Sequence, residues 1–383
     1  MLSVFALDSQ VIQEGLCTGC GACQGLCPYW DSAQGRTIAY FDCARTDGRC
    51  QRFCPRMPTD IAELRKQAFG QEKVLDGIGP FRSLLLARAA DPQIQARAQH
   101  GGVVTALCEL ALKEGLIDAA ALTHAHGALD PEGMLVTDPE KVRECSGSSY
   151  QIPPTLAVVN RALKEEKYKK IGIVGTPCKT LAAYKMMYGT PPEGYEPVRG
   201  ISLVIGLFCG WGLDWDGLRE LAERHADTGS IRHMDIPPSK YHCLQITDDS
   251  GTVSVNLDEV VPIVREACHY CADMSCEFAD LSVGGARSED GWDVDKKWNQ
   301  IIVRSRKGEE LIGLAREKGI LEFKDVPDGA IEKLKNACLG KRRKAISHLH
   351  EKYGADNLGY LEPSRAQIEN RYLFFMESKE GPL

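Results

Sequence analysis

Runs of apolar residues alternate with helix-like patterns through the middle of the chain. Four short runs are apolar at most positions and on both faces, which is typical of strands buried between two helical layers: 83–89, 119–123, 171–174 and 201–208. Between and after them, apolar residues recur with helical spacing in three segments: 101–115, 157–164 and 180–188. Strands separated by helices predict a large α/β domain with a mostly parallel or mixed sheet covered on both faces.

The first 60 residues lack this periodicity and are rich in cysteine. The run from Cys17 through Cys20 and Cys23 to Cys27-Pro28 has the spacing of bacterial ferredoxins, in which three thiolates and a more distant one hold a 4Fe-4S cluster. A structural zinc site generally uses two separated cysteine pairs, so zinc is disfavoured. Cys54-Pro55 matches the end of a second run, and we expect Cys54 to complete the first cluster.

A second N-terminal cluster is predicted with an incomplete set of cysteines. Its ligands would be Cys27, Cys43 and Cys50. Asp47 stands three residues before Cys50, where a fourth cysteine normally lies. A carboxylate can bind iron there, the corner iron can be lost to leave a 3Fe-4S centre, or Asp47 can be a solvated turn residue. Two neighbouring clusters would form a short path for single electrons.

Four cysteines of the α/β region are candidates for a third cluster. Cys178 directly follows the run 171–174, and Cys209 directly follows the run 201–208. Because the carboxyl ends of parallel strands meet at one edge of a sheet, both thiols should face that edge. Cys268 and Cys271 supply a closely spaced pair, with Cys276 as a nearby alternative. The set could hold a 4Fe-4S cluster, or Cys178 and Cys209 could be small buried apolar residues.

Composition favours metal binding and disfavours several other classes of function. Sixteen clustered cysteines in 383 residues, without a signal-peptide pattern, indicate metal ligation in the cytoplasm rather than disulfides. A net charge of −7 disfavours nucleic acid as a partner, and the basic run 341–344 is predicted to be a solvated helix face. No apolar run reaches the ~18 residues of a membrane span. No catalytic acid–base residue is predicted.

Short motifs in a fixed order resemble one family. They are Gly101-Gly102-Val103-Val104-Thr105, Ser146-Gly147-Ser148-Ser149-Tyr150, Gly175-Thr176-Pro177-Cys178, the pair Cys268/Cys271 followed by 279–284, and Gly291-Trp292. Over about residues 10–325, the chain resembles the coenzyme F420 hydrogenase/dehydrogenase beta subunits.

The resemblance implies FAD bound in the large domain, although no Rossmann glycine fingerprint is present. By analogy, the residues that line the flavin would be Gly101, Gly102, Val103, Thr105, Ser148, Tyr150, Gly175, Thr176, Pro177 and Lys179. Glycines at a helix start let the backbone N–H groups of the first turn come close to a pyrophosphate and bind it. Lys179 stands where a polar amide is expected, which places a cation either near the flavin or in solvent.

The resemblance and the cysteines together imply an FAD and iron–sulfur oxidoreductase that works as a subunit of a larger complex. FAD would exchange a hydride with a soluble carrier, either the deazaflavin F420 or NAD(P)H, and 4Fe-4S clusters would pass single electrons onward. The expected partner is the catalytic subunit of a hydrogenase, a formate dehydrogenase or a heterodisulfide-reductase-like complex. The alternatives are a flavin relay between ferredoxin and a partner flavoenzyme, and a direct reductase of an organic substrate.

The expected organisation follows the same division. Residues 1–76 form a small ferredoxin-like iron–sulfur domain, in which the segment 61–74 is a helix. The sequence Gly77-Ile78-Gly79-Pro80 breaks the chain, and residues 77–340 form the α/β domain that binds FAD and the third cluster. Residues 341–383 form a helical or extended tail, whose last part from about residue 361 would pack on a partner.

Overall fold

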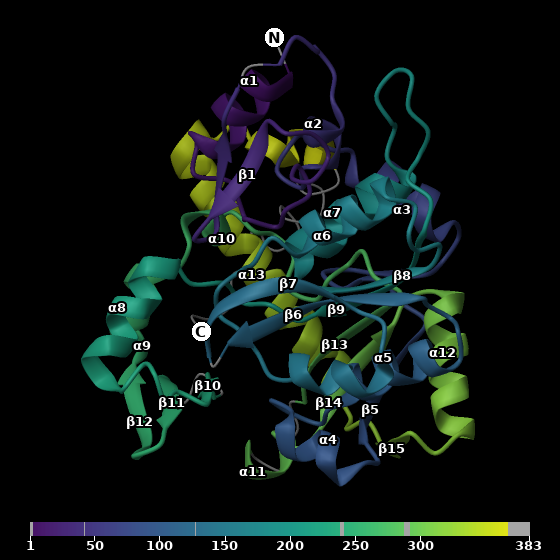
Figure 1. Cartoon of the computed structure of the whole chain (residues 1–383), viewed down its shortest axis with the longest axis vertical. Coiled ribbons are helices and arrows are strands. Elements are labelled where there is room, and N and C mark those ends of the chain that lie inside the picture. The colour runs from purple at the N-terminus through teal and green to yellow at the C-terminus, as the bar shows by residue number, and fades with distance from the viewer. Residues whose placement is uncertain (1–2, 42, 127, 238–240, 287–291, 367–383) are drawn as a thin grey trace.

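An eight-stranded mixed sheet lies at the centre of the computed structural model (Figure 1). The structure describes residues 3–41, 43–126, 128–237, 241–286 and 292–366. In spatial order the strands are β15 (Leu321–Lys324), β5 (Ser83–Ala89), β14 (Asn299–Val303), β13 (Leu281–Gly285), β9 (Ile201–Leu207), β8 (Ile171–Gly175), β6 (Ala119–His126) and β7 (Leu129–Val136).

Most strands of this sheet point in one direction. β6, β8, β9 and β13 form parallel pairs. β14 lies antiparallel between β13 and β5, so β5 has the same direction as β13. The carboxyl ends of these strands therefore meet at one edge, which is where open α/β sheets bind their ligands. β7 and β15 run antiparallel at the two ends of the sheet. The predicted α/β domain with a mixed sheet is confirmed.

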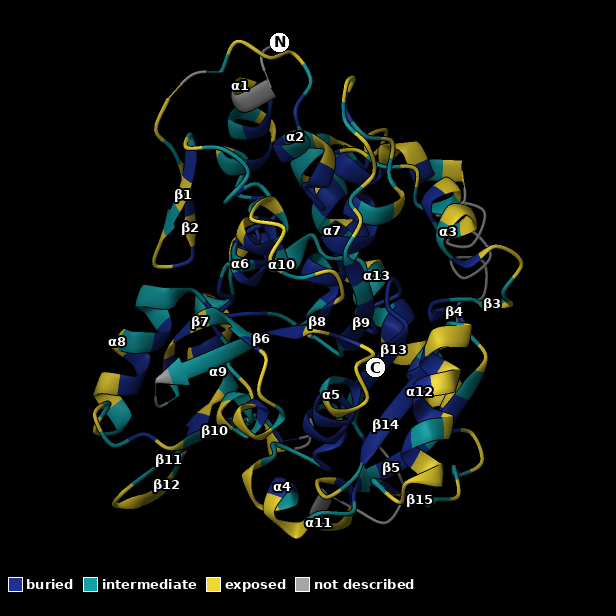
Figure 2. Ribbon diagram, turned by 45° about the vertical axis from the view of Figure 1, so that its right-hand side comes forward, coloured by how far each residue is buried: buried dark blue, intermediate teal, exposed yellow. Residues whose placement is uncertain are grey.

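Helices cover both faces of the sheet, which explains why its strands are apolar on both sides (Figure 2). Helices α5 (Val103–Lys113) and α12 (Arg306–Glu317) pack on one face, and α6 (Thr155–Lys164) and α7 (Pro177–Tyr188) on the other. Neighbouring strand residues alternate between the two cores, as Val204 and Ile205 do in β9. Helix α13 (Ala330–Tyr353) covers β5 and β14 through contacts with Leu84 and Ile302.

The N-terminal segment forms a further layer beyond α6 and α7, at the top of Figure 1. Its elements are α1 (Ser3–Leu7), the π-helix η1 (Asp8–Ile12), the hairpin β1 (Trp30–Ala33) and β2 (Arg36–Ala39), α2 (Arg49–Phe53) and α3 (Ile61–Phe69). The end of α13 and the short helix η5 (Gly359–Ser364) lie at this same end of the molecule, where they pack with Tyr270.

The remaining elements are short. Those that connect or flank the central strands are β3 (Val74–Leu75), β4 (Gly79–Pro80), α4 (Pro92–Arg97), the 3-10 helix η2 (Pro139–Cys145) and α11 (Trp292–Asp295). A small antiparallel sheet with its helices forms a side lobe, visible on the left of Figure 1: α8 (Trp215–His225), β10 (His233–Asp235), β11 (Cys243–Asp248), β12 (Gly251–Asn256), α9 (Leu257–Val260) and η4 (Val261–Ile263). The short helix α10 (Glu266–His269) follows the lobe and contacts α13. In the described part of the chain, no helix has both the length and the apolar character to cross a membrane.

The predicted strands and helices of the sheet region are confirmed, with ends that differ by a few residues. The predicted helix 61–74 is too long. It ends as α3 at Phe69, because Gly70 takes a φ of 60°, and Val74 then pairs with Pro80 in a small hairpin. Helix α13 runs without a break across the expected boundary at residue 340, which stays a prediction. The tail 367–383 lies outside the described residues.

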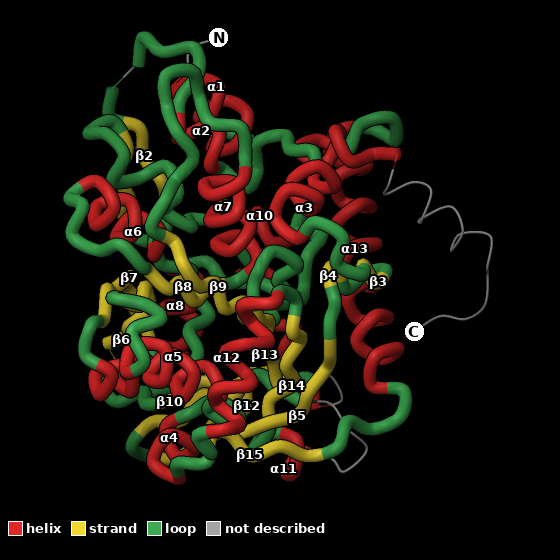
Figure 3. The backbone as a smooth tube through the Cα atoms, turned by 90° about the vertical axis from the view of Figure 1, so that its right-hand side faces the viewer, coloured by secondary structure: helices red, strands yellow, loops and turns green. Residues whose placement is uncertain are grey.

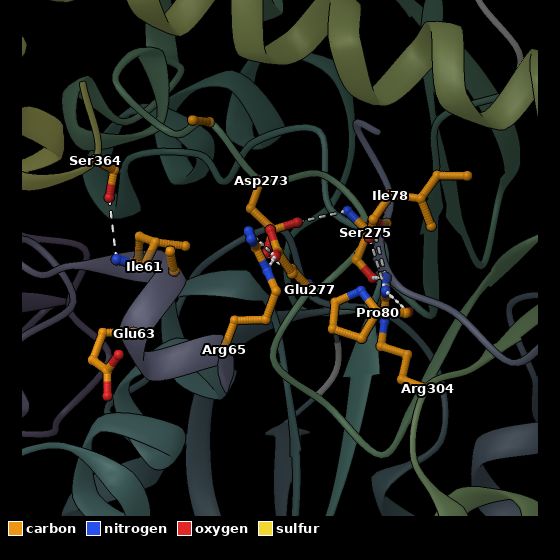
Figure 4. Close-up of polar contacts among 12 residues, drawn as sticks. Ile61, Glu63, Arg65, Ile78, Pro80, Asp273, Ser275, Glu277, Arg304 and Ser364 are labelled. Atoms are coloured by element: carbon orange, nitrogen blue, oxygen red, sulfur yellow. Dashed lines mark hydrogen bonds and ion pairs between the residues drawn. The ribbon is translucent and has the colours of Figure 1, made fainter. Parts of the chain in front are cut away.

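A buried arginine ties the segment that precedes β13 to the rest of the domain (Figure 4). Arg304 has an exposed fraction of 0%. Its guanidinium donates hydrogen bonds to the carbonyl oxygens of Ile78, Pro80 and Ser275, at 2.8, 2.8 and 2.9 Å, and to the Ser282 hydroxyl at 2.7 Å. The carbonyls of Ile78 and Ser275 belong to irregular backbone, and that of Pro80 ends the two-residue strand β4, so the arginine supplies donors that longer secondary structure would otherwise provide.

Replacing Arg304 with methionine is therefore expected to destabilise the protein by about 3 kcal/mol, because buried carbonyl groups lose their donors. The measurement is the apparent midpoint of anaerobic thermal unfolding, followed by circular dichroism. The matched control is Arg306→Met, since the Arg306 side chain is 82% exposed and pairs with Glu310 at 3.1 Å. Equal midpoints for the two variants would contradict a structural role for Arg304.

Candidate functional site

The four predicted ligands of the first cluster lie together. The Cys20 and Cys23 thiols are close enough to interact electrostatically with Cys17 and Cys54. Burial raises the pKa of Cys54 to about 11, and the backbone N–H of Arg56 donates a hydrogen bond to its sulfur at 3.4 Å. Neighbouring buried thiols oppose one another's ionisation, so a positively charged metal centre that binds thiolates fits this group.

Two helices of the α/β domain hold the loops that carry these cysteines. From α6, the buried Asn160 side chain donates hydrogen bonds to the carbonyl oxygens of Ala22 and Gln24, at 3.0 and 2.7 Å. From α7, the Lys185 ammonium donates to the carbonyl oxygen of Cys54 at 2.5 Å. Because long-range contacts fix both loops, the positions of their sulfurs depend on the sheet domain as well as on local spacing.

The cysteines expected for the second cluster gather in the adjacent core. Cys27, Cys43 and Cys50 belong to the apolar core that also contains Cys54, and Cys50 interacts electrostatically with Cys23 of the first group. The two N-terminal groups of thiols are therefore neighbours, as the ferredoxin spacing predicts.

Asp47 makes a bidentate ion pair. Both of its carboxylate oxygens accept hydrogen bonds from the Arg52 guanidinium at 2.8 Å, and this contact lowers the pKa of Asp47 below its usual value. Iron ligation by Asp47 would compete with that ion pair. The role of Asp47 as a ligand of the second cluster stays a prediction.

The four cysteines proposed for a third cluster also lie together; they form the third thiol group, Cys178, Cys209, Cys268 and Cys271. The Cys209 thiol interacts electrostatically with Cys178, Cys268 and Cys271. Cys178 and Cys209 follow β8 and β9 at the carboxyl edge of the sheet, while Cys268 lies in α10 and Cys271 in the loop after it. The backbone N–H of Gly212 donates a hydrogen bond to the Cys268 sulfur at 3.2 Å. N–H groups directed at sulfur are typical of iron–sulfur sites.

Cys276 faces a different part of the structure. It has an exposed fraction of 0%, and its thiol donates hydrogen bonds to the carbonyl oxygen of Leu207 at 3.0 Å and, more weakly, to that of Gly175 at 3.6 Å. These contacts place Cys276 against the strands, so the geometry favours Cys271 as the fourth ligand of the third group.

The geometry of the three groups of cysteines can be compared with what a 4Fe-4S cluster requires. Within the described ranges, no three His, Cys, Asp or Glu side chains are arranged to hold one metal ion. In a 4Fe-4S cluster each thiolate bonds to a different iron, so the sulfurs stand further apart than around one ion. The grouping of the cysteines, their N–H···S contacts and the cations beside them fit such a cluster.

Two positively charged side chains, those of Arg56 and Lys341, lie beside the third thiol group. Arg56, with an exposed fraction of 5%, interacts electrostatically with Cys178 and Cys271. The Lys341 ammonium from α13 interacts with Cys209 and Cys271. Burial acts to raise the pKa of Cys271, but Lys341 and Arg56 together bring it below its ordinary value. These charges favour a thiolate at Cys271.

The prediction that the basic run 341–344 is a solvated helix face is wrong for its first half. Lys341 and Arg342 are half-buried and point to the loop around Cys271, whereas Arg343 and Lys344 are exposed. The sequence shows the charges but carries no signal for the loop that packs against them. Arg56 was missed for a similar reason, because its contacts with Ala267 and Tyr360 are distant in sequence.

The residues expected at the flavin lie along the carboxyl edge of the sheet. Gly102, at a φ of 76°, precedes α5, and Thr176 precedes α7. Neither N-cap residue caps its helix through a side chain, although the first N–H of α5, that of Val103, donates to the Asn299 side-chain oxygen at 3.2 Å. The other N–H groups at these helix starts suit the phosphates of a dinucleotide. Packing also requires the glycine, since a Cβ on Gly102 would lie 2.8 Å from Ile94.

The segment 146–150 lies beside the start of α5 and near Cys209. The Thr105 and Ser146 hydroxyls lie 3.3 Å apart. The Tyr150 side chain interacts with Gln99, just before the glycine pair, and its ring centroid lies 6.5 Å from that of Trp211, just after Cys209. These contacts place the segment near two of the elements that carry the expected flavin residues and the third thiol group. Ser148 is exposed on this segment.

Lys179 is buried, so the solvent-exposed alternative for this residue is wrong. Its exposed fraction is 3%, its ammonium donates a hydrogen bond to the Thr155 hydroxyl at 2.8 Å, and burial lowers its pKa to about 8. It interacts electrostatically with Cys178 and Cys20. Lys179 therefore lies between the first and third thiol groups.

Mutation can distinguish Cys271 from Cys276 as the fourth ligand of the third cluster. We expect Cys271→Ala to lower the iron content of anaerobically purified protein by about four atoms per chain, because one cluster is lost. The matched variant Cys276→Ala should retain its iron, since that thiol donates to backbone carbonyls. The reverse pattern, measured by iron quantitation on both proteins, would contradict the assignment of Cys271.

Family models match two adjoining parts of the chain. The model of the N-terminal part of the coenzyme F420 hydrogenase/dehydrogenase beta subunit matches residues 84–160, and the model of its C terminus matches residues 168–329. The N-terminal cysteine segment and helix α13 lie outside these two ranges.

Individual relatives agree with the family models. A coenzyme F420 hydrogenase subunit beta from Methanococcus voltae is 30% identical over 253 residues, which cover 65% of this chain and 86% of the relative. One of the subunits of the F420H2 dehydrogenase of Methanosarcina mazei is 26% identical over 90% of this chain and 94% of its own length. A coenzyme F420-dependent sulfite reductase from Methanocaldococcus jannaschii is 27% identical over 90% of this chain and 52% of its own length.

A solved structure shares the fold. A chain of the F420-reducing [NiFe] hydrogenase complex from Methanosarcina barkeri superposes with a TM-score of 0.65 at 24% identity, over 72% of this chain and 93% of that one. The matched domains and the relatives lead to one conclusion: the chain belongs to the family of coenzyme F420 hydrogenase/dehydrogenase beta subunits.

Proposed function

We propose that the chain is an iron–sulfur flavoprotein subunit that exchanges a hydride with coenzyme F420 and conducts single electrons to a partner subunit. The observation that carries this proposal is the convergence of thiols from distant segments. Cys20 of the first group interacts electrostatically with Cys178 of the third group, and Cys23 interacts with Cys50 of the second. Three clusters held by these groups would form one path from the sheet edge to the N-terminal layer.

The rim of the sheet supports a flavin beside the third thiol group. FAD, when bound, supplies the conversion between a two-electron hydride and single electrons. The N–H groups at the starts of α5 and α7 would bind its pyrophosphate, with the Thr105 and Thr176 side chains as further donors. Thr176 lies 3.3 Å from the Cys178 sulfur through its hydroxyl, so the same turn would contact both cofactors.

The choice of carrier and partner rests on the relatives. Among those with printed functions are subunits of a coenzyme F420 hydrogenase, an F420H2 dehydrogenase and an F420-dependent formate dehydrogenase, and an F420-dependent sulfite reductase. We therefore propose F420 as the carrier, with a separate catalytic subunit at the far end of the cluster path. The N-terminal segment, which contains two of the thiol groups and lies beyond α6 and α7, is the proposed exit toward that partner.

The carrier can be identified by anaerobic titration of the oxidised protein with reduced F420, NADPH and reduced ferredoxin in turn. We expect reduced F420 to bleach the flavin absorbance and then the broad cluster absorbance, with NADPH much slower. Bleaching by reduced ferredoxin alone would contradict this proposal and favour the ferredoxin relay. A protein that no carrier or artificial donor bleaches would contradict any oxidoreductase function.

The same titration on two cysteine variants tests the direction of the path. Cys54→Ala should still lose its flavin absorbance to reduced F420, whereas its N-terminal clusters should stay oxidised or be absent. Cys243→Ala is the matched control, because Cys243 lies on β11 in the side lobe. Full reduction of the N-terminal clusters by reduced F420 in Cys271→Ala would contradict a path that passes through the third group.

A further inference from the structure

A lysine of α13 joins two of the loops that carry the third thiol group. Helix α13 begins at Ala330, immediately after the last residue that the family model matches. From its middle, the Lys341 ammonium donates hydrogen bonds to the carbonyl oxygens of Cys209 and Asp273, at 2.7 and 2.9 Å. Cys209 follows β9, and Asp273 lies two residues after Cys271. One side chain therefore fixes the distance between the two loops.

The packing of α13 holds this ammonium in place. Leu334 and Cys338 are buried against the sheet, and Leu339 is also buried. Arg342, next to Lys341, donates a long hydrogen bond of 3.5 Å to the carbonyl oxygen of Ala272 and lies 3.9 Å from the Glu277 carboxylate. The helix cannot turn Lys341 into solvent without breaking these contacts.

The positive charge of Lys341 is directed at sulfur. Its ammonium interacts electrostatically with Cys271, Cys209 and Cys268 and with the Asp273 carboxylate, and both of its hydrogen-bond acceptors are neutral carbonyl groups. Three arginines, Arg56, Arg65 and Arg304, face this loop from other elements, and the loop itself carries the carboxylates of Asp273 and Glu277.

The two carboxylates of this loop make their direct contacts with groups other than Lys341. The Asp273 carboxylate accepts hydrogen bonds from the backbone N–H groups of Ser275 and Glu277, at 3.0 and 2.8 Å. The Glu277 carboxylate pairs with the Arg65 guanidinium at 2.5 Å (Figure 4). Within the described residues neither carboxylate forms a direct ion pair with Lys341, and Asp273 interacts with this ammonium only at longer range.

We propose that the fixed positive charge of Lys341 raises the reduction potential of the third 4Fe-4S cluster. The inference rests on the proposed function, because it requires that cluster. Reduction adds one electron, and so one negative charge, to a group already held by four thiolates. A buried cation nearby favours the more negative state, and the interaction is strong because the protein interior screens it weakly. An electron would therefore reside preferentially beside the rim of the sheet.

The test is a redox titration of the purified protein, followed by electron paramagnetic resonance. Lys341→Met removes the charge and Lys341→Arg retains it, while Lys344→Met removes an exposed charge from the same helix. The signal of the third cluster is identified as the one that Cys271→Ala lacks. We expect Lys341→Met to lower the reduced-to-oxidised ratio of this cluster roughly tenfold at the wild-type midpoint, a shift of about 59 mV for one electron. The other two clusters, and all clusters of Lys341→Arg and Lys344→Met, should keep their midpoints.

Three outcomes would overturn the inference: an unmoved midpoint in Lys341→Met, an equal shift in Lys341→Arg, or an equal shift of all clusters. If Lys341→Met loses the third cluster, the iron content of Lys341→Arg is measured instead. A Lys341→Arg protein that keeps this cluster supports a need for the positive charge, and one that loses it overturns the inference. A wild-type protein that lacks the third cluster contradicts the proposed function itself. Full iron content with an unmoved midpoint contradicts the role of Lys341 alone.

Discussion

Burying several thiolates together is the constraint on which the rest of the structure depends. Each charged sulfur loses its hydration, and neighbouring sulfurs repel one another, so burial raises the pKa of Cys54 to about 11 and that of Cys209 to about 12. Positive charge has to offset this cost. Iron can supply part of it, and the buried side chains of Arg56 and Lys179 and the half-buried side chain of Lys341 supply more.

The same constraint explains why contacts from distant segments hold the cysteine loops. Such loops have little regular secondary structure, so their carbonyl groups need donors from side chains. Asn160 and Lys185 serve the N-terminal loops, Arg304 serves the segment before β13, and Lys341 serves the loops after β9 and α10. Figure 3 shows how α7, α10 and α13 come together between the N-terminal layer and the strands. Small displacements of these helices would separate the thiols.

The sequence predicts the parts of this arrangement that depend on local pattern. Apolar runs such as 171–174 identify the buried strands, and cysteine spacing identifies the first thiol group, because three of its members lie within seven residues of one loop. The length of α3 was overestimated because apolar periodicity continues past Gly70 while the backbone cannot. Antiparallel strands such as β14 were not predicted, since the direction of a strand depends on a connection whose path has no local signal.

Charge is the feature that local pattern predicts least well. Lys341 and Lys344 belong to one basic run, yet one faces the thiols and the other faces solvent. Only the neighbour across the helix distinguishes them, and that neighbour is a loop some 70 residues earlier in the chain. The same holds for Lys179, whose burial follows from the packing of α6 on α7 through Thr155. Cofactor sites built from long-range contacts are therefore only partly visible in sequence.

The presence of three clusters can be tested most directly by measuring iron, acid-labile sulfide and flavin in protein purified without oxygen. Three thiol groups predict about twelve iron atoms, or eleven if the second cluster has lost its corner, with about twelve sulfides and one FAD per chain. A colourless protein with zinc in place of iron, or with iron but no labile sulfide, would contradict the assignment of these cysteines.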